Sequence, residues 1–191
     1  MASVGRFVTR KLKLVVNAQK SAIRRADGVA PFLLLTGLGF VFRTRRADIR
    51  VSAKNFDRLK VRVREITSRN RGVSFERMLG ELSRYLRGWM GYFGLASTKA
   101  VFSRLDEWIR RRVRMYLWKQ WRLPRTRIRN LLRLGVPRDL AIPHGASRKG
   151  YWRLAKTLGG HLGLTKQWLR AQGLVFLRYL WGDLAPLRRT A

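Results

Sequence analysis

Apolar residues recur every three or four positions along residues 75–93. That spacing places their side chains on one side of an α-helix. Ser74 can cap the start of this helix, and Gly94 can close its end. The pattern therefore predicts a helix that packs through a single apolar stripe. The stripe comprises Phe75, Met78, Leu79, Leu82, Leu86, Trp89, Met90 and Phe93.

The other side of the same helix carries Arg84, Gly88 and Gly91. Glycine costs roughly 1 kcal/mol relative to alanine inside a helix. Glycines beside an arginine therefore indicate that a phosphate or another backbone comes close. Close packing of a neighbouring helix explains them equally well.

Similar stripes predict helices over residues 53–69 and from Ser97 or Thr98 to about residue 121. A further helix begins at Pro124 and closes at Gly135. In the third helix Asp106 and Glu107 lie outside the apolar stripe. We expect each to form an ion pair with the arginine four residues later, Arg110 or Arg111. The stripe of that third helix is Val101, Phe102, Leu105, Trp108, Ile109, Val113 and Tyr116.

The segments before and after these helices have less regular patterns of apolar residues. Residues 7–16 suggest a helix that runs into a strand, with Leu12, Leu14 and Val16 alternating against their neighbours. Segments 37–42 and 48–52 suggest a β-hairpin. Residues 137–145 suggest a loop, 148–162 a helix, and the last helical region is interrupted at Gly173 and resumes over 174–180. We therefore expect a mainly α protein with a small hairpin in front of its helices.

The charge of the chain restricts its partners. Forty-three Lys and Arg residues face ten Asp and Glu residues, which gives a formal net charge of +33. Such a charge repels itself unless a polyanion is bound. The cations follow the helical segments, as in nucleic-acid-binding proteins. Membrane insertion is not expected, because the longest apolar run, Pro31 to Phe42, is shorter than the roughly 18–20 residues of a spanning helix.

The sequence offers little for catalysis. It has no cysteine and only two histidines, which excludes disulfides and argues against a structural zinc site. No closely spaced aspartate pair could hold the two metal ions of phosphoryl transfer. We therefore expect no catalytic residue and no metal site. The first 26 residues are arginine-rich and lack acids, as in organellar transit peptides, but we expect a bacterial cytoplasmic protein.

Basic residues on the outward faces of the helices are the candidate nucleic-acid contacts. Trp118 falls among the arginines of the third helix, where an indole could stack on a base and contribute roughly 1–3 kcal/mol. The alternative is that a later helix buries Trp118. Trp89, Phe93, Trp108 and Tyr116 are assigned to the core. The candidate contacts are Arg58, Arg62, Arg84, Arg87, Arg111, Arg114, Trp118, Arg122, Arg125 and Arg127.

Several stretches resemble the C-terminal part of group II intron reverse transcriptase/maturases. The thumb of that family, called the maturase-specific domain or domain X, is similar to IRVSAKNFDRLKVRVREITSRNRGVSFERMLGELSRYLRGWMGYFGLA and LDEWIRRRVRMYLWKQWRLPRTRIRNLLRLGV. The segment after the thumb in bacterial members is similar to ASRKGYWRLAKTL and LTKQWLRAQGLVFLRYLW. The last palm strands are similar to RKLKLVVNAQKSAI and GLGFVF. The resemblance implies a palm end over 1–52, a helical thumb over 53–136 and a basic helical extension over 137–191.

The resemblance implies a ribonucleoprotein component that grips structured intron RNA and assists splicing. The YADD-type aspartates of the family's polymerase lie upstream of this region and are not in the sequence. We therefore expect no reverse transcription by this chain alone, and Mg²⁺ only through a palm domain that it lacks. Residues 26–36 depart from the family pattern.

Two alternatives remain open. The chain can be one piece of a split reverse transcriptase, acting on RNA or DNA with a separate finger and palm polypeptide. It can also be a remnant without a selected function.

Overall fold

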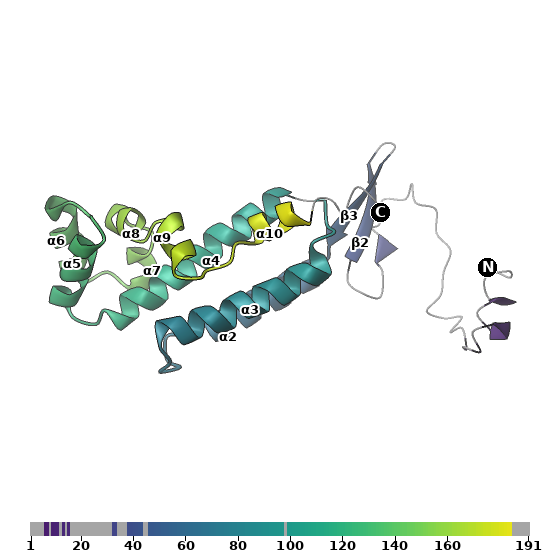
Figure 1. Ribbon diagram of the computed structural model, residues 1–191, viewed down its shortest axis with the longest axis horizontal. Coiled ribbons are helices and arrows are strands. Elements are labelled where there is room, and N and C mark those ends of the chain that lie inside the picture. The colour runs from purple at the N-terminus through teal and green to yellow at the C-terminus, as the bar shows by residue number, and fades with distance from the viewer. Residues whose placement is uncertain are drawn as a thin grey trace.

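The computed structural model describes residues 46–97 and 99–184, together with 6–7, 9–11, 13, 15, 32–33 and 38–43. Side chains are described for all of these except 32–33, 38–43 and 46–49. The fold is mainly α, as predicted. The long helices α2 (Ala53–Ile66), α3 (Phe75–Phe93) and α4 (Lys99–Gln120) run along the long axis of the molecule (Figure 1). The shorter helices are α5 (Pro124–Arg133), α6 (Arg138–Ala146), α7 (Tyr151–Leu154), α8 (Leu158–Gly163), α9 (Lys166–Ala171) and α10 (Leu177–Asp183).

Helix α3 has the predicted bounds. Its cap is the predicted one, because the Ser74 hydroxyl accepts a hydrogen bond from the Arg77 N–H at 3.2 Å. All eight residues of its apolar stripe are buried. Gly88 and Gly91 are exposed, and a Cβ at either position would meet no described atom within 4 Å. Close packing of a neighbouring helix against these glycines is therefore wrong for the described part of the chain.

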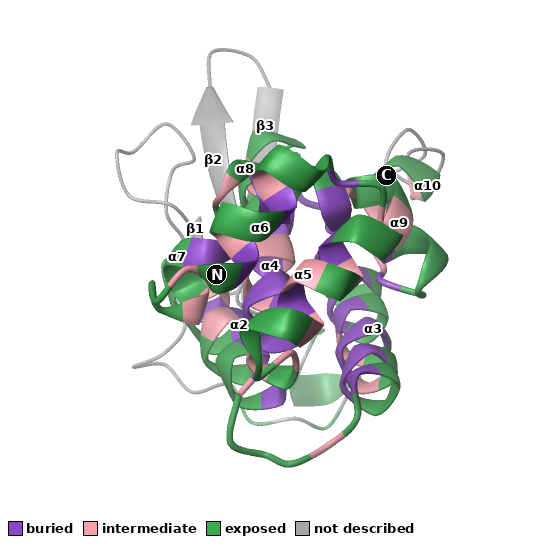
Figure 2. Cartoon of the chain, turned by 90° about the vertical axis from the view of Figure 1, so that its left-hand side faces the viewer, coloured by how far each residue is buried: buried purple, intermediate pink, exposed green. Residues whose placement is uncertain are grey.

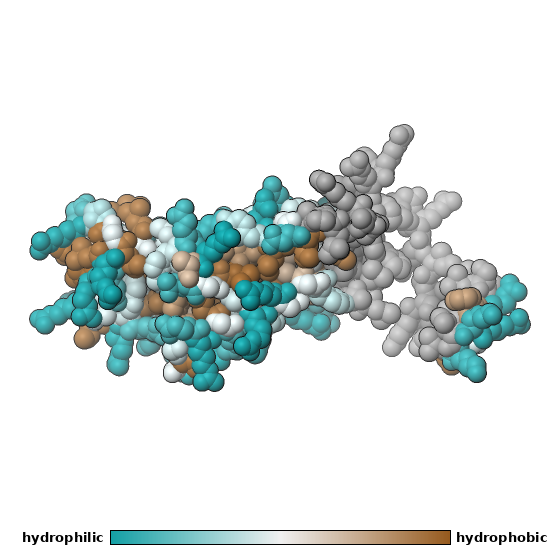
Figure 3. Space-filling view, in the orientation of Figure 1, coloured by the Kyte–Doolittle hydropathy of each residue, from teal (hydrophilic) through white to brown (hydrophobic). Residues whose placement is uncertain are grey.

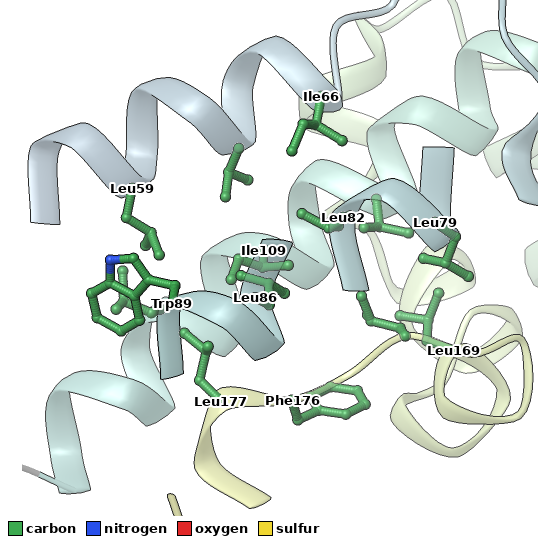
Figure 4. Close-up of a cluster of buried hydrophobic side chains, with 14 of the residues drawn as sticks. Leu59, Ile66, Leu79, Leu82, Leu86, Trp89, Ile109, Leu169, Phe176 and Leu177 are labelled. Atoms are coloured by element: carbon green, nitrogen blue, oxygen red, sulfur yellow. The ribbon is translucent and has the colours of Figure 1, made fainter. Parts of the chain in front are cut away.

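The main core lies between α2, α3 and α4 and is closed by the C-terminal segment (Figure 4). Leu59 and Ile66 come from α2, and Ile109 comes from α4. The C-terminal residues of this core are Leu164, Leu169, Leu174, Phe176 and Leu177. The predicted extension over 137–191 and the predicted thumb over 53–136 thus share one core.

Polar contacts fix the C-terminal segment on the long helices. The Ser83 hydroxyl donates to the Gly173 carbonyl at 2.8 Å, and the Trp181 indole donates to the Ala96 carbonyl at 2.7 Å. The buried Asp106 carboxylate accepts from the N–H groups of Leu177 and Arg178 at 2.8 and 2.9 Å. Asp106 therefore caps the start of α10.

The predicted four-residue ion pairs on α4 are not among the ion pairs of the described residues. Asp106 turns to α10, and Arg111, the partner expected for Glu107, lies against Trp152. The pattern of a single helix could not foresee either contact, because both partners belong to later segments.

Helix α4 is buried on two sides. Tyr116 and Leu117 face the main core, whereas Met115 and Trp118 belong to a second core. Figure 2 shows α4 in the middle of the helices that surround it. Trp118 is 0% exposed, so its predicted stacking on a base is wrong and the alternative of burial under later helices is confirmed. The other members of the second core are Leu131, Val136, Ala141, Leu154 and Ala155.

Two predictions for the C-terminal half are wrong. Residues 138–146 form α6 and not a loop, although Pro143 lies inside the helix. Pro143 cannot donate a helical hydrogen bond, but α6 packs closely against α5, where a Cβ on Gly145 would come within 2.5 Å of Ile128. Residues 148–162 form α7 and α8 with a break between them. Gly173 interrupts the last helical region as predicted, with φ of 98°.

The predicted hairpin corresponds to β2 (Leu38–Arg43) and β3 (Arg46–Val51), which pair antiparallel from Leu38↔Val51 to Arg43↔Arg46. β1 (Phe32–Leu33) pairs with the other side of β2. Nearer the N-terminus, residues 6–7 and 9–10 are helical. The strand predicted after them is wrong at the described positions 13 and 15, because Lys13 has φ of 50°, outside the β region. Leu12, Leu14 and Val16 lie outside the described residues.

None of the helices in the described part combines the length and apolar character needed to cross a membrane.

Candidate nucleic-acid interface

Arg114, a predicted RNA contact, is a buried structural residue. Its side chain is 5% exposed, because α8 and the residues after it cover this face of α4. Its Nε donates to the Leu164 carbonyl at 2.9 Å, and its Nη1 donates to His161 Nδ1 at 3.1 Å. Burial, followed by repulsion from Arg110, lowers the pKa of Arg114 to about 10. Arg114 therefore cannot reach a phosphate.

Arg127 was expected to point outward and is also buried. Its guanidinium donates to the carbonyls of Trp121 and Arg122 at 2.9 and 3.0 Å. These contacts hold the turn between α4 and α5, so the prediction of an RNA contact is wrong. The unpredicted Arg112 has a similar role at the end of α2, where it donates to the Thr67 hydroxyl at 2.9 Å.

The contact between Arg114 and His161 predicts a pH dependence of stability. An arginine only donates, so His161 Nδ1 must be unprotonated. Burial, and then the charges of Arg114, Arg110 and Lys156, lower the pKa of His161 below its ordinary 6.5. The unfolded chain therefore binds a proton more readily, and the free energy of unfolding should fall as the pH drops below about 6.5.

Urea unfolding of the wild-type chain and of His161→Gln between about pH 5 and 7.5 measures this effect. Glutamine keeps an acceptor for Arg114 but does not titrate. The variant should therefore lose stability less steeply with acid than the wild type. If the free energy of unfolding falls equally with pH in the two proteins, His161 is not the source of the pH dependence.

A group of cations surrounds the start of α7. Arg111 lies 3.9 Å from the ring centroid of Trp152 and donates to the Trp152 carbonyl at 3.2 Å. The guanidinium of Arg69 and the ammonium of Lys119 lie 5.8 and 5.7 Å from the ring of Tyr151. We call Arg69, Arg111, Lys119, Tyr151 and Trp152 the Tyr151–Trp152 cluster.

No carboxylate pairs with the cations of the Tyr151–Trp152 cluster in the part of the chain that the structure describes. Trp152 is 37% exposed, so one edge of the cluster is accessible. Cation–π contacts hold the charged groups in place but do not neutralise them. The cluster is therefore an ordered cationic surface.

The outward faces of α2 and α3 carry four exposed candidates, Arg58, Arg62, Arg84 and Arg87. Arg62 pairs with Glu65 at 2.8 Å and lies 3.7 Å from Glu81. Glu81 also pairs with Arg71 at 2.7 Å. This face is thus partly neutralised, unlike the Tyr151–Trp152 cluster.

Arg122 and Arg125 are exposed at the turn between α4 and α5. The structure thus places the ten predicted contacts in separate places. Four are on the faces of α2 and α3, Arg111 is in the cluster, two are at this turn, and Trp118, Arg114 and Arg127 are buried. Hydrophilic side chains cover much of the face seen in Figure 3.

Sequence reasoning missed Arg69, Lys119, Tyr151 and Trp152. The adjacent aromatics in KGYWR were visible, but their cationic neighbours come from α4 and from the turn after α2. The described residues contain no group of three or more His, Cys, Asp or Glu side chains suited to a metal ion.

A mainly helical body with an ordered cationic surface is typical of a nucleic-acid-binding domain. Residues 56–135 match the family described as group II intron, maturase-specific domain. The match runs from α2 to the turn after α5. This region of the chain is therefore similar to the group II intron maturase-specific domain. No curated protein sequence matches the chain.

Proposed function

We propose that the chain binds structured group II intron RNA and favours its folded form, so that it assists splicing without contributing a catalytic group. The observation that carries this proposal is the Tyr151–Trp152 cluster, whose cations have no carboxylate partner among the described residues. Phosphates would supply the missing negative charge. The exposed arginines Arg58, Arg84, Arg87, Arg122 and Arg125 would extend the contact along the RNA.

A second candidate function is participation in reverse transcription with a separate finger and palm polypeptide. The hairpin of β2 and β3 directly precedes α2, where the resemblance implies the last palm strands. An adjacent reading frame that encodes the YADD-type aspartates of the family would favour this function, and its absence would count against it.

Salt dependence tests the RNA-binding proposal. If about six phosphates are neutralised, a plot of log affinity against log salt should have a slope near −5, taking about 0.9 per contact as for duplex DNA. Filter binding or fluorescence anisotropy with an intron RNA measures the slope. A slope near zero would contradict phosphate recognition.

The cluster itself is tested by replacing Arg69 and Arg111 together by alanine. Two lost phosphate contacts should make the salt slope less steep by about 2 and lower the affinity for intron RNA. The thermal midpoint should change little, because Arg69 is exposed and Arg111 only half-buried.

The matched control replaces Arg104 and Arg138, which are exposed elsewhere on α4 and α6. It removes the same charge and should weaken binding less. Equal losses in the two double variants would show that the cluster is not the binding surface.

A further inference from the structure

A cleft of about 460 Å³ lies where the start of α3, the end of α4, α5 and α9 meet. Figure 1 shows α5 and the end of α4 at the end of the molecule away from β2 and β3. The volume is within the roughly 300–1,000 Å³ of small-ligand sites. Neither the ten predicted contacts nor the Tyr151–Trp152 cluster line this cleft.

Aromatic rings form part of its lining. Phe75 and Trp168 stack with their centroids 6.2 Å apart and an interplanar angle of 21°. Trp121 is held edge-on by the buried Trp118, with centroids 5.7 Å apart. The two lining indoles are only half-buried. An indole that is fixed in place but partly open is suited to stacking on a nucleobase.

The polar lining has unused hydrogen-bonding capacity. The side-chain amides of Asn130 and Gln172 and the carboxylate of Glu76 have no hydrogen bond or ion pair to another described residue. Arg133, also in the lining, has no carboxylate partner in the same part of the chain. Amides both donate and accept, which matches the mixed donors and acceptors of a base edge. A guanidinium can bind the adjoining phosphate.

We propose that this cleft binds one unpaired RNA base. The base stacks on a lining indole, Asn130 and Gln172 bind its edge, and Arg133 contacts its phosphate. This inference rests on the proposed RNA binding and adds a preference for unpaired nucleotides. A formal charge of +33 favours a base within RNA over an uncharged aromatic ligand.

The test compares short RNA duplexes that carry one bulged nucleotide with the same duplex carrying an abasic bulge. The phosphates are identical, so only the base differs. At least one of the four bases should raise the affinity about tenfold over the abasic bulge, which is about 1.4 kcal/mol and within the range for one stacked base. The double variant N130A/Q172A keeps the lining indoles but loses the hydrogen bonds to the base edge, so it should show a smaller gain and bind the fully paired duplex as the wild type does.

The control variant N70A/Q167A removes the same two amides from exposed positions outside the cleft and should keep the gain. Equal affinity for all bulges, with the duplex still bound, overturns the cleft and leaves the RNA-binding proposal standing. A gain that is undiminished in N130A/Q172A also overturns it. Binding to none of these RNAs at low salt overturns both proposals.

Discussion

Replacing Trp118 by alanine is expected to lower the free energy of unfolding by about 3–5 kcal/mol. Trp118 is fully buried in the second core, against Trp121 and near Gly160. Removing the indole leaves a cavity that α4 and its neighbours cannot fill. Urea unfolding followed by far-UV circular dichroism measures the loss.

Two variants control this experiment. Trp118→Phe should lose much less, because Trp118 Nε1 is buried without a hydrogen-bond partner among the described residues, and phenylalanine removes that unsatisfied donor. Trp152→Ala, at a partly exposed tryptophan, should cost less than about 1 kcal/mol. A Trp118→Ala variant as stable as the wild type, with weaker RNA binding, would restore the stacking role that the structure excludes.

Replacing Asp106 by alanine is expected to cost about 2–3 kcal/mol of unfolding free energy. The variant leaves the N–H groups of Leu177 and Arg178 at the start of α10 without their acceptor. Burial raises the pKa of Asp106, and the two hydrogen bonds from Arg178 and Leu177 oppose this shift. Leu177, a core residue, should loosen together with α10.

Asp106→Asn is expected to lie between alanine and wild type, because one carboxylate oxygen becomes an N–H₂ group that faces a donor. Glu107→Ala, at the exposed neighbouring position, should change stability by no more than about 0.5 kcal/mol. Equal effects of the substitutions at Asp106 and Glu107 in urea unfolding would argue against the cap.

The helices that pack through one stripe could be predicted from the sequence. In α3 the bounds, the Ser74 cap and all eight stripe residues agree with the structure. Prediction fails in α4 because this helix is covered on two sides, and a one-stripe pattern then assigns Trp118 to the outside. The loop predicted over 137–145 fails because contact with α5 outweighs the local preference of Pro143.

The sequence predicted that the candidate interface is basic, but it did not predict which arginines are exposed on it. The arginines that remain exposed, such as Arg58 and Arg84, lie on the faces of α2 and α3 that the periodicity left outside. Arg114 and Arg127 carry the same charge but bind backbone carbonyls of their own chain. A helical projection cannot distinguish an exposed arginine from one that binds a carbonyl of its own chain, because these carbonyls belong to other segments or to a turn.

The C-terminal segment that closes the main core determines where the protein can be truncated for expression. The family match ends at residue 135, but Leu164, Leu169 and Leu177 complete the core of α2, α3 and α4. A recombinant fragment cut at the edge of the match would leave apolar faces of α3 and α4 open to water and prone to aggregation. Fragments for expression or crystallisation should therefore extend through α10, because the sequence-family boundary and the folding boundary differ.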